Sequence, residues 1–304
     1  MEQEIETTTA PTKPRNPFIA ILFSIVLPGF GQVYNGQYKK GILFFGLILI
    51  IPFVFGITRM ITSFYGFAAL FTIEMTLRIY IILDAFKNAK LQKEYILKPY
   101  NTWYYHLAIY IGMLIVLTVY DMNSVLGVQS LKIPTIANSP TIQIGDLVVA
   151  DMKAYENKQP EYGDMVLFSH SNGQIYTYRV VGLPNDKIEL KNNMVSINGK
   201  PCNSKFIKET TIKGIPVNEF EEELPNGKKH FIYKFEKPFN IEKTNFESIT
   251  IPPNSYFLLG DNRDNAADSR YEGFITKDRI KGQIMYSYWG ETGIDRININ
   301  FAGK

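Results

Sequence analysis

The sequence is poor in cysteine and histidine, and its charges nearly balance. A single cysteine, Cys202, excludes an internal disulfide and any metal site built from several cysteines. The three histidines, His106, His170 and His230, are scattered without metal-ligand spacing, and nothing local supports a Ser-His-Asp arrangement. The net charge of +3 comes without a basic stripe with interleaved aromatics, which disfavours a nucleic-acid partner. We therefore expect no metal, no cofactor and no nucleic acid.

Hydropathy divides the chain sharply. Residues 17–122 are strongly apolar, whereas residues 123–304 are mixed in character and rich in turns. Residues 1–16 are polar and contain threonine and proline, which predicts a disordered tail. Because this tail begins acidic and no small-residue cleavage site follows the first apolar run, we expect no removable signal peptide. The length of 304 residues suits about two domains.

Residues 17–122 are expected to form a multi-pass α-helical membrane region with three to four apolar segments. These segments are Pro17–Leu27, Gly41–Ile57, Ser63–Phe86 and Tyr104–Tyr120. A spanning helix needs about 20 apolar residues, so the second and fourth segments are short but acceptable. Pro28 and nearby glycines interrupt the first segment, which predicts a bent hairpin or re-entrant element against the second. Glu74 and Arg78 share a helix face, and a structural ion pair is favoured over a transport or relay site.

Lysines predict the orientation of this region. The loops before the second and fourth segments are rich in lysine: Lys39, Lys40, Lys87, Lys90, Lys93 and Lys98. The positive-inside tendency places both loops in the cytoplasm, so everything after Asp121 lies outside. The N-terminus with Lys13 and Arg15 is cytoplasmic if the first segment does not cross, which we prefer, and external if it does.

Residues 123–304 are expected to form a mostly β domain, such as a distorted sandwich or barrel. Turn dipeptides precede apolar runs at Gly145–Ala150 and Gly163–Phe168, and the pattern continues over residues 174–183 and 187–197. Residues 203–250 are more polar and predict an inserted β subdomain. Its run of glutamates is expected to lie on a solvated face, and consists of Glu219, Glu221, Glu222 and Glu223.

The segment Gly260–Tyr271 concentrates charge directly after the buried strand predicted for Tyr256–Leu259. It holds three aspartates, two arginines and two asparagines within ten residues. Such a cluster can be buried only if its charges pair and its polar atoms are hydrogen-bonded. A calcium loop would need carboxylates at alternate positions and a late glutamate, and the interleaved Arg263 and Arg270 argue against it. We expect an ordered, ion-paired loop, with a solvated acidic loop as the alternative.

This segment resembles the Gly-Asp-Asn-Arg-Asp-Asn-Ser-x-Asp-Ser-Arg signature of type I signal peptidases (peptidase family S26, bacterial leader peptidase-like), with Ala266 in place of the first serine. Further blocks resemble the same family: Ile133–Ile142, Tyr176–Asp186, Ile251-Pro252, and Ile280, Gly282 and Trp289. The resemblance covers essentially all of residues 123–304. Outside it, the string Gly29–Gly41 resembles small bacterial membrane hairpins of the TM2-like type, which implies no chemistry.

The resemblance implies a catalytic set that this sequence lacks. In the family a serine hydroxyl attacks the scissile carbonyl, and a buried neutral lysine takes its proton. The matching positions hold Ala137 for the nucleophile, Tyr178 for the base and Ala266 for the serine that orients the lysine. Alanine has no nucleophilic atom, and a phenol with a pKa near about 10 is a poor base. Three coordinated losses favour a natural pseudopeptidase over a chain silenced by a single engineered change.

A rescue by other groups is the alternative. Ser139 would be the nucleophile, with Lys132 or Lys187 as base. A shift of two residues along an extended chain moves the side chain by about 6–7 Å, and Pro140 restricts Ser139 to extended geometry. The competing interpretation of Ser139 is an exposed or turn-capping hydroxyl.

The resemblance also implies a groove that binds an extended peptide by adding a strand to a sheet edge, with small pockets for alanine-like side chains. The expected groove and scaffold residues are Pro134, Asn138, Pro140, Thr141, Arg179, Gly182, Pro184, Asp186, Gly260, Asp261, Asn262, Arg263, Asp264, Asp268, Ser269 and Arg270.

The function expected from this resemblance is that of a catalytically inactive signal peptidase homologue in the bacterial inner membrane, with its β domain extracytoplasmic. It would bind signal peptides or secretory precursors, and the Sec export machinery, an active signal peptidase and membrane lipid are further candidate partners. Two alternatives stay open. One is an active signal peptidase with relocated catalytic groups, and the other is a membrane scaffold whose N-terminal helices are the working part.

Overall fold

The computed structural model describes residues 13–96 and 102–302, and divides them into two compact units. A helical unit comprises the residues up to Ile61 and Tyr65–Leu126, and a β unit comprises Thr62–Phe64 and Gly127–Lys304. Residues 1–12 of the expected tail, and Lys98 of the lysine-rich loop, lie outside the described residues. Lys13 and Arg15 are held in place, because their backbone N–H groups donate to Tyr95 O and Gln92 O at 2.9 and 3.1 Å.

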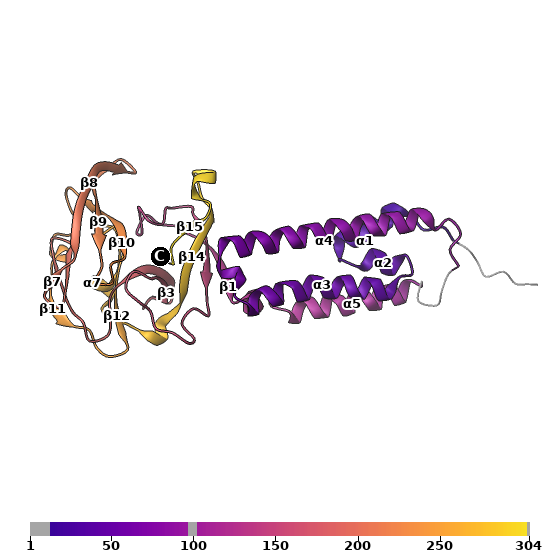
Figure 1. The fold of residues 1–304 in the computed structure, drawn as a ribbon, viewed down its shortest axis with the longest axis horizontal. Coiled ribbons are helices and arrows are strands. Elements are labelled where there is room, and N and C mark those ends of the chain that lie inside the picture. The colour runs from indigo at the N-terminus through magenta and orange to yellow at the C-terminus, as the bar shows by residue number, and fades with distance from the viewer. Residues whose placement is uncertain (1–12, 97–101, 303–304) are drawn as a thin grey trace, which may run out of the picture. The chain divides into compact units, whose positions relative to one another are not determined.

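The helical unit is built from apolar helices of unequal length (Figure 1). They are α1 (Pro17–Val26), α2 (Phe30–Tyr34), α3 (Tyr38–Ile57), α4 (Phe64–Leu91), α5 (Trp103–Val119) and α6 (Met122–Leu126). Among the described residues, α3 and α4 are the two helices long and apolar enough to cross a membrane, whereas α1 and α5 are apolar but shorter. The Glu74 and Arg78 side chains approach to 4.0 Å on α4, as their spacing predicts.

The first apolar segment is bent where its sequence predicts a break. Asn16 caps α1 by accepting from Phe18 N at 2.9 Å, and the chain turns at Gly29, whose φ is 89°. A Cβ at Gly29 would lie 2.1 Å from Gly41 O, so only glycine lets the hairpin lie this close to the start of α3.

Polar residues of this hairpin dock onto α4. Gln32 and Lys40 both reach the Asp84 carboxylate, at 3.0 and 2.6 Å, and Asn35 donates to Ala85 O at 2.8 Å. The string Gly29–Gly41 therefore has a structural use, which is to satisfy a partly buried carboxylate on an apolar helix.

The β unit contains three antiparallel sheets (Figure 1). The largest has the strand order β1-β2-β14-β3-β4-β12-β13, with β15 paired to β14. Its strands are β1 (Val128–Lys132), β2 (Leu147–Asp151), β3 (Met165–Ser169), β4 (Ile175–Gly182), β12 (Ser255–Leu259), β13 (Ile275–Thr276), β14 (Ile280–Trp289) and β15 (Ile299–Asn300). A mostly β domain was predicted and is confirmed, although as several sheets rather than one sandwich.

The two smaller sheets come from the middle of the chain. One has the order β11-β5-β6-β7 and the other β10-β9-β8. Their strands are β5 (Lys187–Lys191), β6 (Met194–Ile197), β7 (Lys200–Pro201), β8 (Asn203–Ile212), β9 (Ile215–Glu223), β10 (Lys229–Phe235) and β11 (Phe246–Thr250). Residues 203–235 thus form a sheet of their own, whereas β11 pairs with β5.

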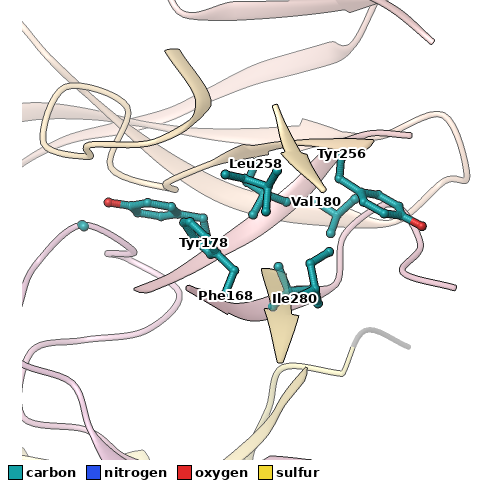
Figure 2. Close-up of a cluster of buried hydrophobic side chains, with 9 residues drawn as sticks. Phe168, Tyr178, Val180, Tyr256, Leu258 and Ile280 are labelled. Carbon is teal, nitrogen blue, oxygen red and sulfur yellow. The ribbon is translucent and has the colours of Figure 1, made fainter. Parts of the chain in front are cut away.

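The core of the β unit is organised by β12, every residue of which is buried. Side chains alternate across a strand. Tyr256 and Leu258 therefore enter one hydrophobic cluster, with Phe168 and Tyr178 (Figure 2). Phe257 and Leu259 enter a second one. The charged segment Gly260–Tyr271 begins where this strand leaves the core.

The prediction of a solvated glutamate face on β9 is wrong for two of its members. Glu222 is fully buried and Glu219 is 8% exposed. The reason is that β9 is the central strand of its sheet, and that Glu222 forms an ion pair with Arg263 of the charged segment. Glu221 and Glu223 remain partly accessible.

Replacing Gly29 by alanine tests the hairpin geometry. The new Cβ meets Gly41 O, so we expect Gly29→Ala to destabilise the full chain by about 1–3 kcal/mol, as overpacking does. Gly46→Ala on α3 is the control, since its Cβ meets nothing within 4 Å, and it should stabilise by about 0.5–1 kcal/mol. Thermal unfolding in detergent measures both, and equal melting temperatures for the two variants would contradict the close approach.

Candidate functional site

The three positions that lack catalytic groups meet at one point. A Cβ built on Gly260 would lie 2.3 Å from Ala266 Cβ, 2.7 Å from Ala137 O and 3.3 Å from a ring carbon of Tyr178. Ala137 and Tyr178 share a buried cluster against which Ala266 packs. Ala137 and Ala266 are more than one hundred positions apart in the sequence, yet both lie beside Gly260. A side chain at position 260 would collide with them, so this position requires glycine.

Tyr178 lies in an environment that makes it a poor base. Its side chain is 2% exposed, and burial together with the negative charge of Asp268 raises its pKa above the usual value. Figure 2 shows its hydroxyl at one end of the cluster, pointing away from Tyr256. At neutral pH the phenol keeps its proton, and the Ala137 methyl beside it offers no atom to activate.

A groove lies beside Ala137 and Tyr178. A cavity of about 420 Å³ is lined by residues 131–135, 137 and 138, by residues 174–178 of and before β4, and by Leu167, Asn265 and Ala267. Of the residues predicted for the groove, Pro134 and Asn138 line it directly, together with Ala137 and Tyr178. This volume lies in the range of small-ligand and short-peptide pockets.

One wall of the groove is a partly open strand edge. β4 pairs with β3 over Ile175–Arg179, but its pairing with β12 begins only at Arg179. Asn138 Nδ2 donates to Thr177 O at 2.7 Å across this edge. Asn138 Oδ1 and Thr177 Oγ1 are buried and have no hydrogen-bond partner among the residues that the structure describes. Asn138 and Thr177 both line the groove, so these buried, unsatisfied atoms lie in its wall.

The Arg179–Asp261 ion pair holds β4 to the charged segment. Arg179 Nε and Nη2 donate to the two carboxylate oxygens of Asp261 at 2.8 and 2.7 Å, and Nη1 donates to Gly163 O at 2.8 Å. Burial opposes ionisation of Asp261, but the Arg179 guanidinium wins and lowers its pKa. Asn262 N in turn donates to Ala137 O at 3.0 Å, which fixes the backbone at Ala137.

Two further arginines pair just as closely. Arg263 donates to both oxygens of Glu222, at 3.2 and 2.5 Å, and Arg270 donates to Asp268 from Nε and Nη2 at 2.8 Å each. Asn193 connects them, because its carbonyl accepts from Arg263 and its side chain accepts from Arg270. The prediction of an ordered, ion-paired loop is confirmed, and the loop joins all three sheets.

The other predicted scaffold residues support this frame without lining the groove. Asp268 accepts from Gly260 N at 3.1 Å, Ser269 Oγ accepts from Leu258 N at 2.9 Å, and Asp264 accepts from Phe235 N at 2.8 Å. Thr141 Oγ1 accepts from Arg179 at 3.3 Å, beside Pro140, which follows Ser139 in a cis peptide bond.

Gly182, Pro184 and Asp186 lie at the second hydrophobic cluster rather than at the groove. A Cβ at Gly182 would lie 2.4 Å from Ile251 Cδ1, and Asp186 accepts from Leu183 N at 2.8 Å across Pro184. They shape the turn between β4 and β5.

The sequence interpretation missed two members of the buried network. Glu222, in the run expected to be solvated, neutralises Arg263, and His230 Nε2 lies 3.3 Å from Glu222 Oε2. Burial and the nearby Arg179 lower the pKa of His230, which favours its neutral form. No signal in the sequence identified Glu222, because the segment Gly260–Tyr271 already holds three aspartates for its two arginines.

The arrangement gives the rescue groups no catalytic geometry. Ser139 is buried, and its backbone N donates to Ile136 O at 3.1 Å. Lys132 and Lys187 are exposed, whereas a neutral lysine base needs a desolvated site. No contact between the Ser139 hydroxyl and a lysine amine occurs within the described chain.

Ser171 lies near His170, but its hydroxyl proton is directed to Glu272 and not to the histidine. Ser171 Oγ is 3.4 Å from His170 Nδ1, while it donates to Glu272 Oε2 at 2.7 Å. Glu272 is also paired with Arg279. A hydroxyl that donates to a carboxylate, without a free base beside it, is not an activated nucleophile.

Comparison with known proteins identifies the family of this chain. The family model described as signal peptidase, peptidase S26, matches residues 103–289. The chain therefore belongs to the signal peptidase family, peptidase S26.

Individual relatives agree with this assignment. The chain is 35% identical over 159 residues to signal peptidase I of Rickettsia typhi, covering 47% of this chain and 59% of the relative, so it spans somewhat over half of that protein. It is 29% identical over 150 residues to signal peptidase IB of Staphylococcus aureus, covering 49% of this chain and 72% of the relative. A solved signal peptidase I from Enterococcus faecalis is 26% identical, covers 41% of this chain and 97% of its own, and gives a TM-score of 0.26.

Glu222→Gln tests the buried network. Leaving Arg263 without a carboxylate should cost about 3–5 kcal/mol of unfolding free energy at pH 7. Burial alone would raise the pKa of Glu222, but Arg263 and His230 lower it from 4.5 to about 2. The stabilisation is therefore complete above pH 4.5 and lost as the pH falls toward 2.

Denaturant unfolding of the full chain in detergent, followed from pH 7 downward, measures this difference. Glu221→Gln is the matched control, because Glu221 forms an exposed pair with Lys229 and should change stability by less than about 1 kcal/mol. A loss in Glu222→Gln no larger than in this control would show that the pair does not hold the fold.

Proposed function

We propose that this chain is a membrane-anchored signal peptidase homologue that binds the signal-peptide region of secretory precursors without cleaving it. The observation that carries the proposal is the meeting of Ala137, Tyr178 and Ala266 around Gly260, at the wall of a groove. The fold keeps the positions of a catalytic set, while the groups that would perform acyl transfer are a methyl group, a protonated phenol and a second methyl group.

The chemistry of the groove supports binding of an extended peptide. Strand addition needs an edge with free backbone groups, and the N-terminal half of β4 has such an edge. Asn138 Oδ1 and Thr177 Oγ1 are buried in the groove wall, and a side-chain rotation would let the first accept from a peptide N–H and the second donate or accept. A buried polar atom without a partner is costly, so a ligand that satisfies both atoms gains affinity.

The helical unit supports a membrane location. α3 and α4 have the length and apolarity of spanning helices, and α1 and α5 add shorter apolar surfaces. With the lysine-rich loops in the cytoplasm, the β unit is extracytoplasmic and meets precursors as they leave the export machinery. Export components or an active signal peptidase are then the natural neighbours.

The two alternatives find less support. Relocated catalysis would need a lysine beside Ser139, and both candidate lysines are exposed. A purely helical working part would leave the groove without a use, although it explains the elaborate docking of Gln32, Asn35 and Lys40 on α4.

Blocking the groove tests peptide binding. We expect the full chain in detergent to bind a labelled peptide with an Ala-x-Ala segment and to leave it intact. Thr135→Trp, at an exposed lining position, should weaken binding by about tenfold or more, because the indole fills the space of the added strand.

Fluorescence anisotropy measures the affinity, and mass spectrometry checks that the peptide is intact. Thr211→Trp, at an exposed position on β8, is the matched control and should bind like the unmodified chain. Equal affinity in both tryptophan variants would place the peptide elsewhere, and no binding at all would sink the proposal.

A further inference from the structure

Arg15 is a buried cation at the start of the helical unit. It is 8% exposed, although it stands only two residues before α1. Its guanidinium carbon lies 4.8 Å from the Tyr34 ring centre and 4.4 Å from that of Tyr95. The two aromatic rings hold the charge by cation–π attraction and fix its position.

This guanidinium lacks the anion that its burial calls for. Nε and Nη2 are buried and have no hydrogen-bond partner among residues 13–96 and 102–302. The Asp84 carboxylate on α4 is engaged by Lys40 and Gln32. Aromatic faces cannot accept these N–H groups as a carboxylate or phosphate does, and a buried charge without such a partner is costly.

Two cavities share Arg15 and Tyr34. One, of about 640 Å³, is otherwise apolar and aromatic, and is lined by Leu22, Phe23, Val26, Phe30, Trp103, His106, Leu107 and Tyr110. Leu22 and Val26 are one turn apart on the same face of α1, so this groove runs away from Arg15 along the helix at about 5.4 Å per turn. The other, of about 780 Å³, is mixed in character: Lys13 and Asn16 line it beside Arg15, together with Pro14, Pro17, Phe18 and Ile19.

We propose that this paired cavity is a binding site for an anionic phospholipid of the surrounding bilayer. The phosphate sits on Arg15 Nε and Nη2, with Lys13 beside it, and an acyl chain lies in the apolar groove against Leu22, Val26 and Leu107. Arginine suits this role because its planar fork matches two phosphate oxygens at once. The two parts of the site, one cationic and one apolar, correspond to the two parts of a phospholipid.

The inference rests on the membrane placement proposed above, but it is independent of peptide capture. The test is thermal unfolding of the full chain in detergent, with phosphatidylglycerol or phosphatidylcholine added. We expect phosphatidylglycerol at saturation to raise the Tm by about 5 °C, because it binds only the folded state, and phosphatidylcholine to raise it much less. Arg15→Gln should abolish the difference between the two lipids, and Arg15→Lys should keep part of it.

Lys39→Gln is the matched control, because it removes one positive charge at an exposed position of α3. It should respond to phosphatidylglycerol as the unmodified chain does. An equal response in Arg15→Gln would overturn the proposal, and so would an equal effect of glycerol phosphate without acyl chains.

The N-terminal tail provides another arm of the experiment. If replacing Glu2, Glu4 and Glu6 by glutamine removes the lipid effect or destabilises the lipid-free chain as Arg15→Gln does, Arg15 binds the tail and the proposal fails. Peptide binding by Arg15→Gln should stay unchanged, so that this result is separate from the test of the groove.

Discussion

A buried guanidinium needs a carboxylate beside it, and this requirement organises the β unit. Arg179, Arg263 and Arg270 are each less than a tenth exposed. In each case two guanidinium nitrogens donate to the two oxygens of one buried carboxylate. The Arg179–Asp261 and Arg263–Glu222 pairs join the segment after β12 to β4 and β9, and Arg263 and Arg270 both donate to Asn193 in the β5–β6 turn. The Arg270–Asp268 pair lies within the segment itself and keeps this arginine in place.

The same network holds the backbone around Ala137, Tyr178 and Ala266 without help from their side chains. Asp261 and Asn262 fix β4 and the backbone of Ala137, and none of these contacts involves the side chains at the three altered positions. Under the proposed function, the change of a serine or a lysine at these positions removes reactive groups and leaves the ion pairs in place. The proposed groove then serves binding alone.

Much of this could be predicted from the sequence, since the charged segment is continuous and its charges demand pairing. The β character, the bend at Pro28–Gly29 and the Glu74–Arg78 pair are local patterns, and these predictions hold. Glu222 could not be identified, because its partner is 41 residues away and strand position alone decides whether a glutamate is solvated. The partners of Asp84, Gln32 and Lys40, could likewise not be predicted, because they depend on how the hairpin packs.

The central claim is that only the missing side chains separate this site from an active one, and restoring them tests it most directly. The measurement is the rate at which the full chain in detergent cleaves a precursor peptide, before and after Ala137→Ser, Tyr178→Lys and Ala266→Ser are combined. The account predicts no cleavage by the unmodified chain or by Ala137→Ser alone, and a gain of about 10²-fold or more in the combined variant once a general base is present. Cleavage by the unmodified chain at the rate of the combined variant would contradict it.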